Sequence, residues 1–372
     1  MNKPYLKVMD EVENPASADL IEDLTTELAD KLPSFDLSHI KRLTNHVGIL
    51  QHATYITPNY HHGYCIDDNA RALILALMAF EKESSDEHNQ LISTYLAYIK
   101  YMQLDNGKFR NFLSFSHVFL DDEGTEDAMG RTIWALGYLL KCNVNPSFHR
   151  TGRELFDRVV PHLYSLRSPR AVSYSILGLI HISERSPEDE GIKELIHHLA
   201  QYIAEEYRQN STSEWSWYEK IISYDNAILP LSLLRASLVL EDESLKLTAM
   251  ESFHFLDSIL FRENYLCIIG NEFWYREGGN PSMYGQQPIE VTSLVLLYEE
   301  MYNITLEKIY KQRMISSFLW FFGKNKQGLQ LYDASSKGCC DGLDSHGVNL
   351  NQGAESTICF WIAYLNISRL LS

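Results

Sequence analysis

Residues 61–77, HHGYCIDDNARALILAL, join a polar and aromatic loop to a helix-forming run of small and apolar residues. The same couplet of loop and helix recurs five more times along the chain. The other copies are GTEDAMGRTIWALGYLL (124–140), RSPRAVSYSILGLI (167–180), WYEKIISYDNAILPLSLL (217–234), YGQQPIEVTSLVLLYEE (284–300) and NQGAESTICFWIAYL (351–365). Equivalent positions in successive copies lie about 42 to 65 residues apart, which is typical of solenoids and closed rings of helix pairs.

One amphipathic helix fits between each couplet and the next, such as HNQLISTYLAYIKYM (88–102) or GRELFDRVVPHLYSL (152–166). A further amphipathic helix, ADLIEDLTTELADKL (18–32), precedes the first couplet. The couplet helices carry little charge beyond their first turns, so we expect them to be buried as an inner ring. The amphipathic helices would form an outer ring. The sequence therefore predicts an all-α fold, an (α/α)6 toroid of six helical hairpins.

Composition agrees with one folded unit. Hydrophobic residues make up 45% of the 372 residues and charged residues 22%, as in ordinary globular proteins. No Pro/Gly/Ser-rich linker divides the chain, and strand-like alternation between turn signals is scarce. We therefore expect a single toroid domain over residues 1–372, with residues 1–15 as an N-terminal extension.

Charge and cysteine usage exclude several classes of partner. The 32 Lys and Arg residues against 49 Asp and Glu give a net charge of −17, which repels phosphate backbones and anionic membranes. We expect neither nucleic acid nor membrane as a partner, since no apolar run has the length of a membrane span. The N-terminus lacks the apolar core of a signal peptide, and the six cysteines lack the spacing of a disulfide framework. Both observations favour a cytoplasmic location.

Three motifs carry a resemblance to known proteins. HGYCIDDNARA (62–72), WYEKIISYDNAILP (217–230) and NQGAEST (351–357) resemble segments of an uncharacterised bacterial helical family, whose members occur alone or fused behind glycosyltransferases. The architecture as a whole is similar to the six-hairpin, (α/α)6-toroid glycosidase superfamily. In that superfamily, loops at the N-terminal ends of the inner helices line a funnel, where carboxylates act as acid and base and aromatic side chains stack on sugars.

The resemblance implies a saccharide substrate and a possible glycosyltransferase or glycan-processing partner. The function that we expect is a glycoside hydrolase acting on short neutral oligosaccharides. One alternative is a sugar 2-epimerase, in which His61, His62 or His346 would act as bases during ring opening. The epimerases' paired histidines do not align with His61 or His346. Another alternative is a carbohydrate-binding toroid without chemistry that assists a glycosyltransferase.

Glycosidic cleavage requires one proton donor and a second carboxylate. We expect Asp68 to be one of them, with Asp225 or Glu219 as its partner. Asp68-Asn69-Ala70 and Asp225-Asn226-Ala227 repeat one motif at the start of two inner helices. Glu219 follows a cluster of aromatic residues, which would raise the pKa of its carboxyl by desolvation. Alternatively, the aspartates are helix N-caps and the aromatic cluster belongs to the core.

The loops before the inner helices supply the predicted substrate-binding residues. They are His61, His62, Tyr64, Asp67, Arg71, Asp127, Arg131, Trp215, Trp217, Trp274, Tyr275, Arg276, Glu290, His346 and Glu355. We expect one common cavity lined by His62, Tyr64, Asp68, Arg131, Trp217, Asp225, Trp274 and Glu355. The i,i+4 spacing of Asp67 with Arg71, repeated by Asp127 with Arg131, also fits ion pairs within single helices.

Signals for cofactors and metals are weak. No G-x-G-x-x-G follows a strand, and GKNKQG (323–328) lacks the pattern of a phosphate-binding loop. Cys339, Cys340 and His346 lack the spacing that orients ligands around zinc. We therefore expect no cofactor and no metal.

Overall fold

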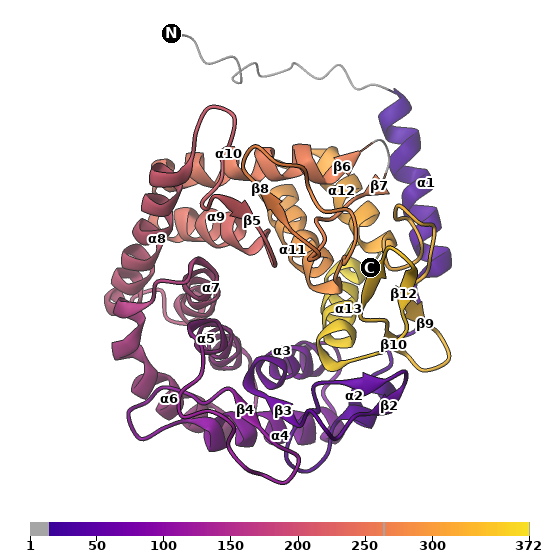
Figure 1. The fold of residues 1–372 in the computed structure, drawn as a ribbon. Helices are drawn as coiled ribbons and strands as arrows, with labels where there is room; N and C mark the ends of the chain where they lie inside the picture. The colour runs from indigo at the N-terminus through magenta and orange to yellow at the C-terminus, as the bar shows by residue number, and fades with distance from the viewer. Residues whose placement is uncertain (1–14, 263–264, 372) are drawn as a thin grey trace.

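The computed structural model describes residues 15–262 and 265–371, so most of the predicted N-terminal extension lies outside the described residues. Each of the six sequence couplets ends in one helix of an inner ring. These helices are α3 (Ile66–Lys82), α5 (Glu126–Lys141), α7 (Pro169–Arg185), α9 (Ile228–Leu240), α11 (Pro288–Thr305) and α13 (Ala354–Ile367). Each packs against the next, and α13 returns to α3, which closes the ring (Figure 1). The predicted (α/α)6 toroid is confirmed.

An outer layer of helices surrounds this ring. It consists of α1 (Pro15–Lys31), α4 (Asp86–Met102), α6 (Pro146–Val159), α8 (Glu190–Asn210), α10 (Glu243–Leu260) and α12 (Lys308–Leu319). Each of the outer helices α4, α6, α8, α10 and α12 packs on the inner helix that precedes it in the chain, while α1 packs on α12. A short helix, α2 (Ser38–Leu43), packs on α13. Two 3-10 turns, η1 (Val160–Ser165) and η2 (Ser368–Leu370), complete the helical elements in the described part of the chain.

Composition explains the two layers. The outer helix α8 buries an apolar stripe that includes Ile192, Ile196 and Ile203, and its other face is charged. The inner helix α13, by contrast, is buried over nearly its whole length, as its run of apolar residues indicates. Apolar residues on all sides stabilise a helix only where neighbours cover every side, as they do inside a ring.

Short strands, which the sequence did not predict, occur in the loops. In the part of the chain that the structure describes, they form six two-stranded antiparallel sheets: β1 (Ala53–Thr54) with β2 (Thr57–Pro58), β3 (Tyr64–Cys65) with β4 (Phe112–Leu113), β5 (Ile221–Ile222) with β8 (Tyr275–Arg276), β6 (Phe261–Arg262) with β7 (Tyr265–Leu266), β9 (Tyr332–Asp333) with β10 (Gly338–Cys339), and β11 (Gly342–Asp344) with β12 (Gly347–Asn349). Two of these pairs, β3–β4 and β5–β8, join different loops, so they tie the loops to one another.

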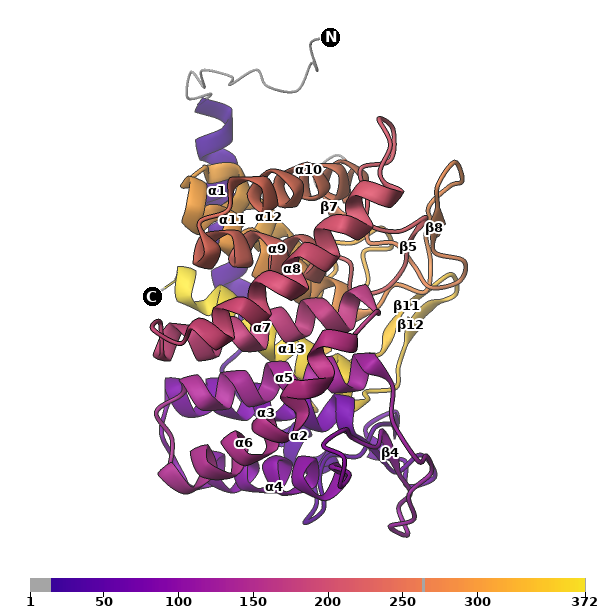
Figure 2. The ribbon, with the colours of Figure 1, turned by 90° about the vertical axis from the view of Figure 1, so that its left-hand side faces the viewer.

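The two faces of the ring differ in their connections. The segments that lead into inner helices are long, as at 103–125 and 320–353, whereas the return turns at 83–85 and 306–307 are short. The strands therefore gather at the N-terminal ends of the inner helices, on the right in Figure 2. We call this side the N-terminal face and the opposite side the C-terminal face.

Two further properties concern the chain as a whole. All six cysteines are buried and free of disulfides. Among the described helices, none combines the length and apolarity needed to cross a membrane.

Candidate active site

The first inner helix begins with two consecutive carboxylates that are not its cap. The N-cap of α3 is Cys65, whose sulfur accepts the backbone N–H of Asp68. Asp67 and Asp68 therefore lie in the first turn, where the positive end of the helix dipole favours negative charge. The alternative that these aspartates are N-caps is wrong.

Arg71 joins two carboxylates from different helices. Its Nη1 donates to Asp68 Oδ1 at 3.0 Å, and its Nη2 lies 2.9 Å from Glu355 Oε2 at the start of α13. Burial raises the pKa of Asp68 to about 6, although the Arg71 charge opposes this shift. Arg71 therefore does not form the expected i,i+4 pair with Asp67, because the approach of α13 to α3 offers it Glu355 instead.

Arg131 also pairs between helices. Its Nη1 lies 2.7 Å from Asp67 Oδ1, and its Nη2 donates to the Tyr174 hydroxyl at 2.9 Å. Asp127, its expected i,i+4 partner, instead accepts the Ser168 hydroxyl at 2.5 Å. Arg131 points along the inner ring toward α3 and α7, whereas Asp127 lies beside the cap of α7, so the expected pair does not form.

Tyr174, which the sequence analysis missed, connects Arg131 to Asp225. Its hydroxyl donates a short hydrogen bond to Asp225 Oδ2. Asp225 is buried with a φ of 47°, a left-handed conformation that costs free energy for a residue with a side chain. Burial raises the pKa of Asp225. The N-cap of α9 is Ala227, so the expectation that Asp225 caps this helix is wrong.

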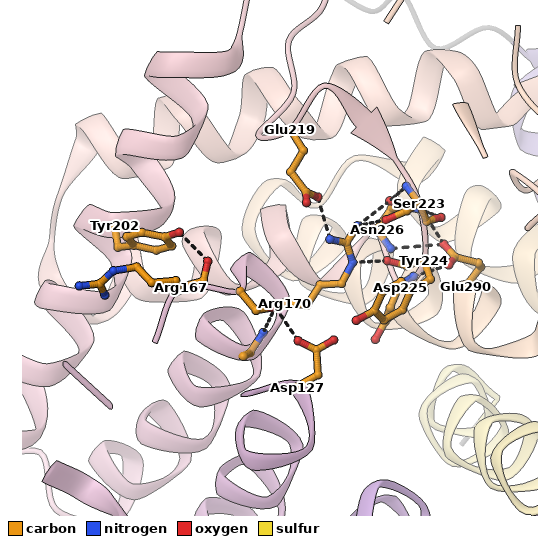
Figure 3. A network of polar contacts seen from close by, with 12 residues as sticks. Asp127, Arg167, Arg170, Tyr202, Glu219, Ser223, Tyr224, Asp225, Asn226 and Glu290 are labelled. Carbon is orange, nitrogen blue, oxygen red and sulfur yellow. Dashed lines mark hydrogen bonds and ion pairs between the residues drawn. The ribbon is translucent and has the colours of Figure 1, made fainter. Parts of the chain in front are cut away.

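Glu290 supports the loop that carries Asp225. Its carboxyl oxygens accept the backbone N–H groups of Asp225 and Asn226 and the side-chain amide of Asn226, the latter at 3.0 Å (Figure 3). Burial raises the pKa of Glu290 to about 8, and the negative charge of Asp225 adds to this effect. Glu290, predicted to bind substrate, thus positions the start of α9.

Glu219 belongs to a neighbouring network around Arg170. Arg170 Nη1 lies 2.7 Å from Glu219 Oε2, and Arg170 Nε donates to the Tyr224 carbonyl at 2.5 Å (Figure 3). The guanidinium also lies 4.7 Å from the ring centroid of Tyr224. The carboxylate of Glu219 therefore meets a buried cation rather than an apolar aromatic wall. The predicted desolvated environment of Glu219 is wrong, because Arg170, which the sequence analysis passed over, fills it.

Three predicted aromatic or phenolic binding residues are part of the core. Trp217 and Tyr64 are 0% exposed, and Trp215 is 2% exposed with its ring nitrogen donating to the Glu219 carbonyl. Buried side chains of this kind cannot stack on a sugar, so their predicted role in substrate binding is wrong. In the sequence, the three aromatic residues between positions 215 and 218 fitted a core as well as a binding site. The packing of Trp217 against Tyr218 and Phe255 shows that they belong to the core.

The remaining predicted residues lie on loops of the N-terminal face. Trp274, Tyr275 and Arg276 belong to the segment around β8, where the Tyr275 ring meets the edge of Trp215 at 5.0 Å between centroids. His61, His62 and His346 are exposed. The ring of His62 meets that of His52 at 4.6 Å between centroids. Burial and the neighbouring His62 lower the pKa of His52.

A cluster made of two chains of contacts thus forms at the N-terminal ends of the inner helices. One chain runs from Asp68 through Arg71 to Glu355, and the other from Asp67 through Arg131, Tyr174 and Asp225 to Glu290. The two chains are neighbours because Asp67 and Asp68 share the first turn of α3, and all of these residues except Tyr174 were singled out in the sequence. Two cavities of the molecule, one beside Glu190 and Asp242 and one beside Trp134 and Arg369, are not lined by residues of this cluster. A common cavity at the cluster stays a prediction, and Trp217 and Tyr64, which are 0% exposed, do not line a solvent-open one.

The described residues include no group of three or more His, Cys, Asp or Glu side chains arranged to hold a metal ion. Cys339 and Cys340 are both buried, whereas His346 is exposed. The chemistry available in the cluster is that of carboxylates, guanidinium groups and one phenol.

Comparison with known proteins defines the class of fold. No family model matches the chain, and no curated protein matches it in sequence. Solved structures do match over nearly the whole chain. A cellobiose 2-epimerase from Spirochaeta thermophila is 13% identical with a TM-score of 0.68, covering 96% of this chain and 99% of that one. A D-mannose isomerase is 12% identical with a TM-score of 0.68, covering 98% and 99%.

A third match is an α-mannanase of glycoside hydrolase family 76 from Bacteroides thetaiotaomicron, 11% identical with a TM-score of 0.65, covering 95% of this chain and 97% of that one. At this level of identity, the likeness shows a shared fold. The chain is therefore an (α/α)6 toroid whose fold occurs in both sugar-isomerising and glycan-cleaving proteins.

Proposed function

We propose that this protein is a carbohydrate-active enzyme and, more narrowly, a glycoside hydrolase that works at the N-terminal face. The observation that carries the proposal is the bridge from Asp68 through Arg71 to Glu355. It holds two carboxylates from different helices in unequal environments. Side-chain exposure is 8% for Asp68 and 36% for Glu355. Unequal environments separate the pKa values of two carboxyls, as an acid and a base require.

The proposed roles follow from these environments. A pKa near 6 leaves a fraction of Asp68 protonated near neutral pH and most of it protonated below pH 6, so that it can donate a proton to the leaving oxygen. Glu355, paired with Arg71 and reachable from solvent, would act on the opposite side as base or nucleophile. Asp67, held by Arg131, would contact the sugar hydroxyls.

This assignment replaces Asp225 and Glu219 as partners of Asp68. Asp225 is 4% exposed and lies behind Tyr174, while Glu219 is occupied by Arg170. In the proposal, Asp225 acts through Tyr174 and Arg131 to position Asp67, and Glu219 positions the loop before α9.

The proteins with similar structures support a saccharide substrate. They include enzymes named for cellobiose, mannose and mannan, and an inactive α-1,6-mannanase of Salegentibacter in which two consecutive aspartates are replaced by alanine. This chain has consecutive aspartates at Asp67–Asp68, at the start of an inner helix. Its other consecutive pair is Asp121–Asp122, where Asp121 accepts the backbone N–H groups of Asn111 and Phe112.

A second candidate, a sugar 2-epimerase, is favoured by the contact between His52 and His62. The lowered pKa of His52 keeps its imidazole neutral near pH 7, and the charge of Glu355 acts on it electrostatically. A neutral imidazole is a competent base for proton abstraction beside a carbonyl. The alternative is tested by the same assay as the hydrolase.

The test is incubation of the full chain with a panel of manno- and gluco-oligosaccharides, with products separated by mass and by chromatography. A hydrolase gives smaller sugars that disappear with Asp68→Asn or Glu355→Gln. An epimerase gives a product of unchanged mass that survives those changes and disappears with His52→Ala. Binding without any product would reject both activities in favour of the binding-only toroid.

The cellular setting is part of the same proposal. Six buried cysteines without disulfides suit a reducing compartment, so we place the protein in the cytoplasm. A glycosyltransferase partner stays a prediction of the sequence.

A further inference from the structure

A cavity of about 350 Å³ opens on the C-terminal face, on the side of the ring away from the candidate active site. All six inner helices line it, so it surrounds the ring axis. Its rim residues, in chain order, are Glu81, Lys141, Glu184, Arg235, Glu299, Glu300, Asn366 and, from η2, Arg369. The volume is sufficient for a small organic molecule.

The deeper wall of this cavity is apolar. It consists of Ile74, Met78, Trp134, Ile180, Leu296 and Ile362, one or more turns before the helix ends. The Trp134 ring is stacked on Tyr174 at 5.9 Å between centroids, so Trp134 separates the cavity from the carboxylate cluster. Tyr138 and His181 add two further rings, in edge contact at 4.9 Å. A ligand therefore needs an apolar part.

The rim carries more negative than positive charge. Lys141 pairs with Glu184 at 2.7 Å, Arg235 pairs with Glu300 at 2.7 Å, and Arg369 approaches Glu299 at 3.7 Å. Glu81 remains, and its carboxylate accepts only the Tyr138 hydroxyl at 2.8 Å and the Cys142 thiol at 3.3 Å, with no ion pair among the described residues. Burial lowers the pKa of His181, so this ring adds no positive charge near neutral pH.

Two features of the rim strengthen this negative potential. The carbonyl ends of six inner helices converge here, and each helix C-terminus carries a partial negative charge. The second feature is Glu299, whose carboxylate lies 3.7 Å from Arg369 Nη1, the longest of the three ion pairs at the rim. A cation in the cavity would meet both Glu299 and Glu81.

We propose that this cavity binds a small organic cation, whose ammonium group lies at the glutamate rim and whose apolar part covers Trp134 and the deeper wall. The rim carboxylates neutralise the ammonium, while the Trp134 ring, stacked on Tyr174 on its other side, packs against the apolar part. A neutral ligand of the same shape gains only the apolar contacts. An anionic ligand meets repulsion from the rim.

Three probes of nearly equal shape test the proposal by calorimetry on the full chain: benzylammonium, benzyl alcohol and benzoate. Benzylammonium is expected to bind with saturation, at least about fivefold more tightly than benzyl alcohol, while benzoate does not bind. Raising the salt concentration should weaken the binding of benzylammonium and leave the binding of benzyl alcohol unchanged. Equal binding of all three probes, or saturable binding of none, overturns the proposal.

Variants locate the site. Glu81→Gln and Glu299→Gln should each weaken benzylammonium about three- to tenfold, the effect of one partly exposed charge. Leu238→Trp should block the cavity without disturbing the core, since Leu238 is 45% exposed at its entrance. The matched control is Glu190→Gln, an exposed carboxylate on α8 outside this cavity. Unchanged affinity for benzylammonium in all three cavity variants, or an equal loss of affinity in the control, contradicts the assignment.

Discussion

At the scale of single residues, the arginines decide what each carboxylate of the N-terminal face can do. Arg71 and Arg131 each pair with a carboxylate on the neighbouring inner helix. A guanidinium presents its donors in a planar fork, so one Arg71 holds both Asp68 and Glu355 in fixed relative positions. Carboxylates that are neighbours in sequence, such as Asp67 and Asp68, thereby acquire different partners and different exposure.

The first prediction concerns Asp68. Asp68→Asn is expected to lower turnover by about 10²-fold or more, because a general acid is lost. The substrate is the oligosaccharide of the panel that the unchanged protein cleaves. Asp225→Asn should lower turnover less, since Asp225 acts through Tyr174 and Arg131. Steady-state kinetics and thermal melting measure both variants. Glu243→Gln, an exposed carboxylate on α10, is the control, and full activity of Asp68→Asn would refute the assigned role.

The second prediction concerns Glu290 and pH. The pKa of Glu290 is about 8 in the fold and 4.5 as its ordinary value, so the folded protein holds a proton that the unfolded chain has released. Stability should therefore fall as pH rises from about 6.5 to about 8.5, by about 1–2 kcal/mol. The buried histidines act in the opposite direction, because the unfolded chain, with an ordinary histidine pKa of 6.5, still releases protons at the lower end of this window. The contribution of Glu290 is therefore the difference between the unchanged protein and Glu290→Gln.

Urea unfolding at both pH values checks this prediction. Glu290→Gln cannot titrate, so the unchanged protein should lose about 1–2 kcal/mol more than this variant across the window. The exposed Glu243 on α10 provides the control, and Glu243→Gln should keep the slope of the unchanged protein. Identical pH profiles of the unchanged protein and Glu290→Gln would contradict the assignment.

At the scale of elements, the closest helix contact in the ring is that of α5 with α7. Glycines make it possible. A Cβ on Gly137 would lie 2.1 Å from the Gly178 carbonyl oxygen, and one on Gly130 would lie 2.5 Å from the Ala171 carbonyl oxygen. These backbone atoms cannot move aside as a flexible side chain can. The contact holds Arg131 on α5 within reach of Tyr174 on α7.

The third prediction follows from this contact. Gly137→Ala is expected to destabilise the protein by about 2–4 kcal/mol, although alanine is the better helix former, because α5 and α7 must separate. Urea unfolding measures the loss. Gly191→Ala, in the first turn of α8 and away from other helices, should change stability by less than about 1 kcal/mol. Similar small losses of stability at both positions would show that the contact between α5 and α7 can accept a Cβ without the helices separating.

At the scale of the whole molecule, the ring closes where the segment before α3 meets the loop before α13. His39 Nε2 hydrogen-bonds the Gln352 carbonyl at 2.9 Å, and the Gln352 N–H donates to the Tyr55 carbonyl at 2.9 Å. The Gln352 side chain continues this junction, since it accepts the Ser336 hydroxyl at 2.6 Å and donates to Asp333 at 3.0 Å. One buried glutamine thus links the N-terminal segment to the loop before α13.

The fourth prediction tests this junction. Gln352→Ala should lower the free energy of unfolding by about 1–3 kcal/mol, because the buried Ser336 hydroxyl loses its acceptor. Amide hydrogen exchange should rise around both His39 and β9–β10, which lie far apart in sequence. Gln209→Ala on the exposed face of α8 serves as the matched control. Faster exchange in only one of the two segments would argue against a shared junction.

The sequence by itself determined the architecture, because its signals are local. A couplet such as 351–365 has the small and apolar composition of a helix covered on all sides, and six such couplets alternate with amphipathic helices. The same repeat also places the residues before each inner helix on one face. Asp68, Arg71 and Glu355 could therefore be assigned to one region from the sequence alone.

Only the tertiary structure decided which of these residues meet and which are buried. Arg131 could pair with Asp127 or with Asp67, and the distance between α3 and α5 favours Asp67. Trp217 could face a ligand or the core, and the packing of its loop buries it. Such choices depend on contacts between helices far apart in the chain, which composition and spacing within one segment do not specify.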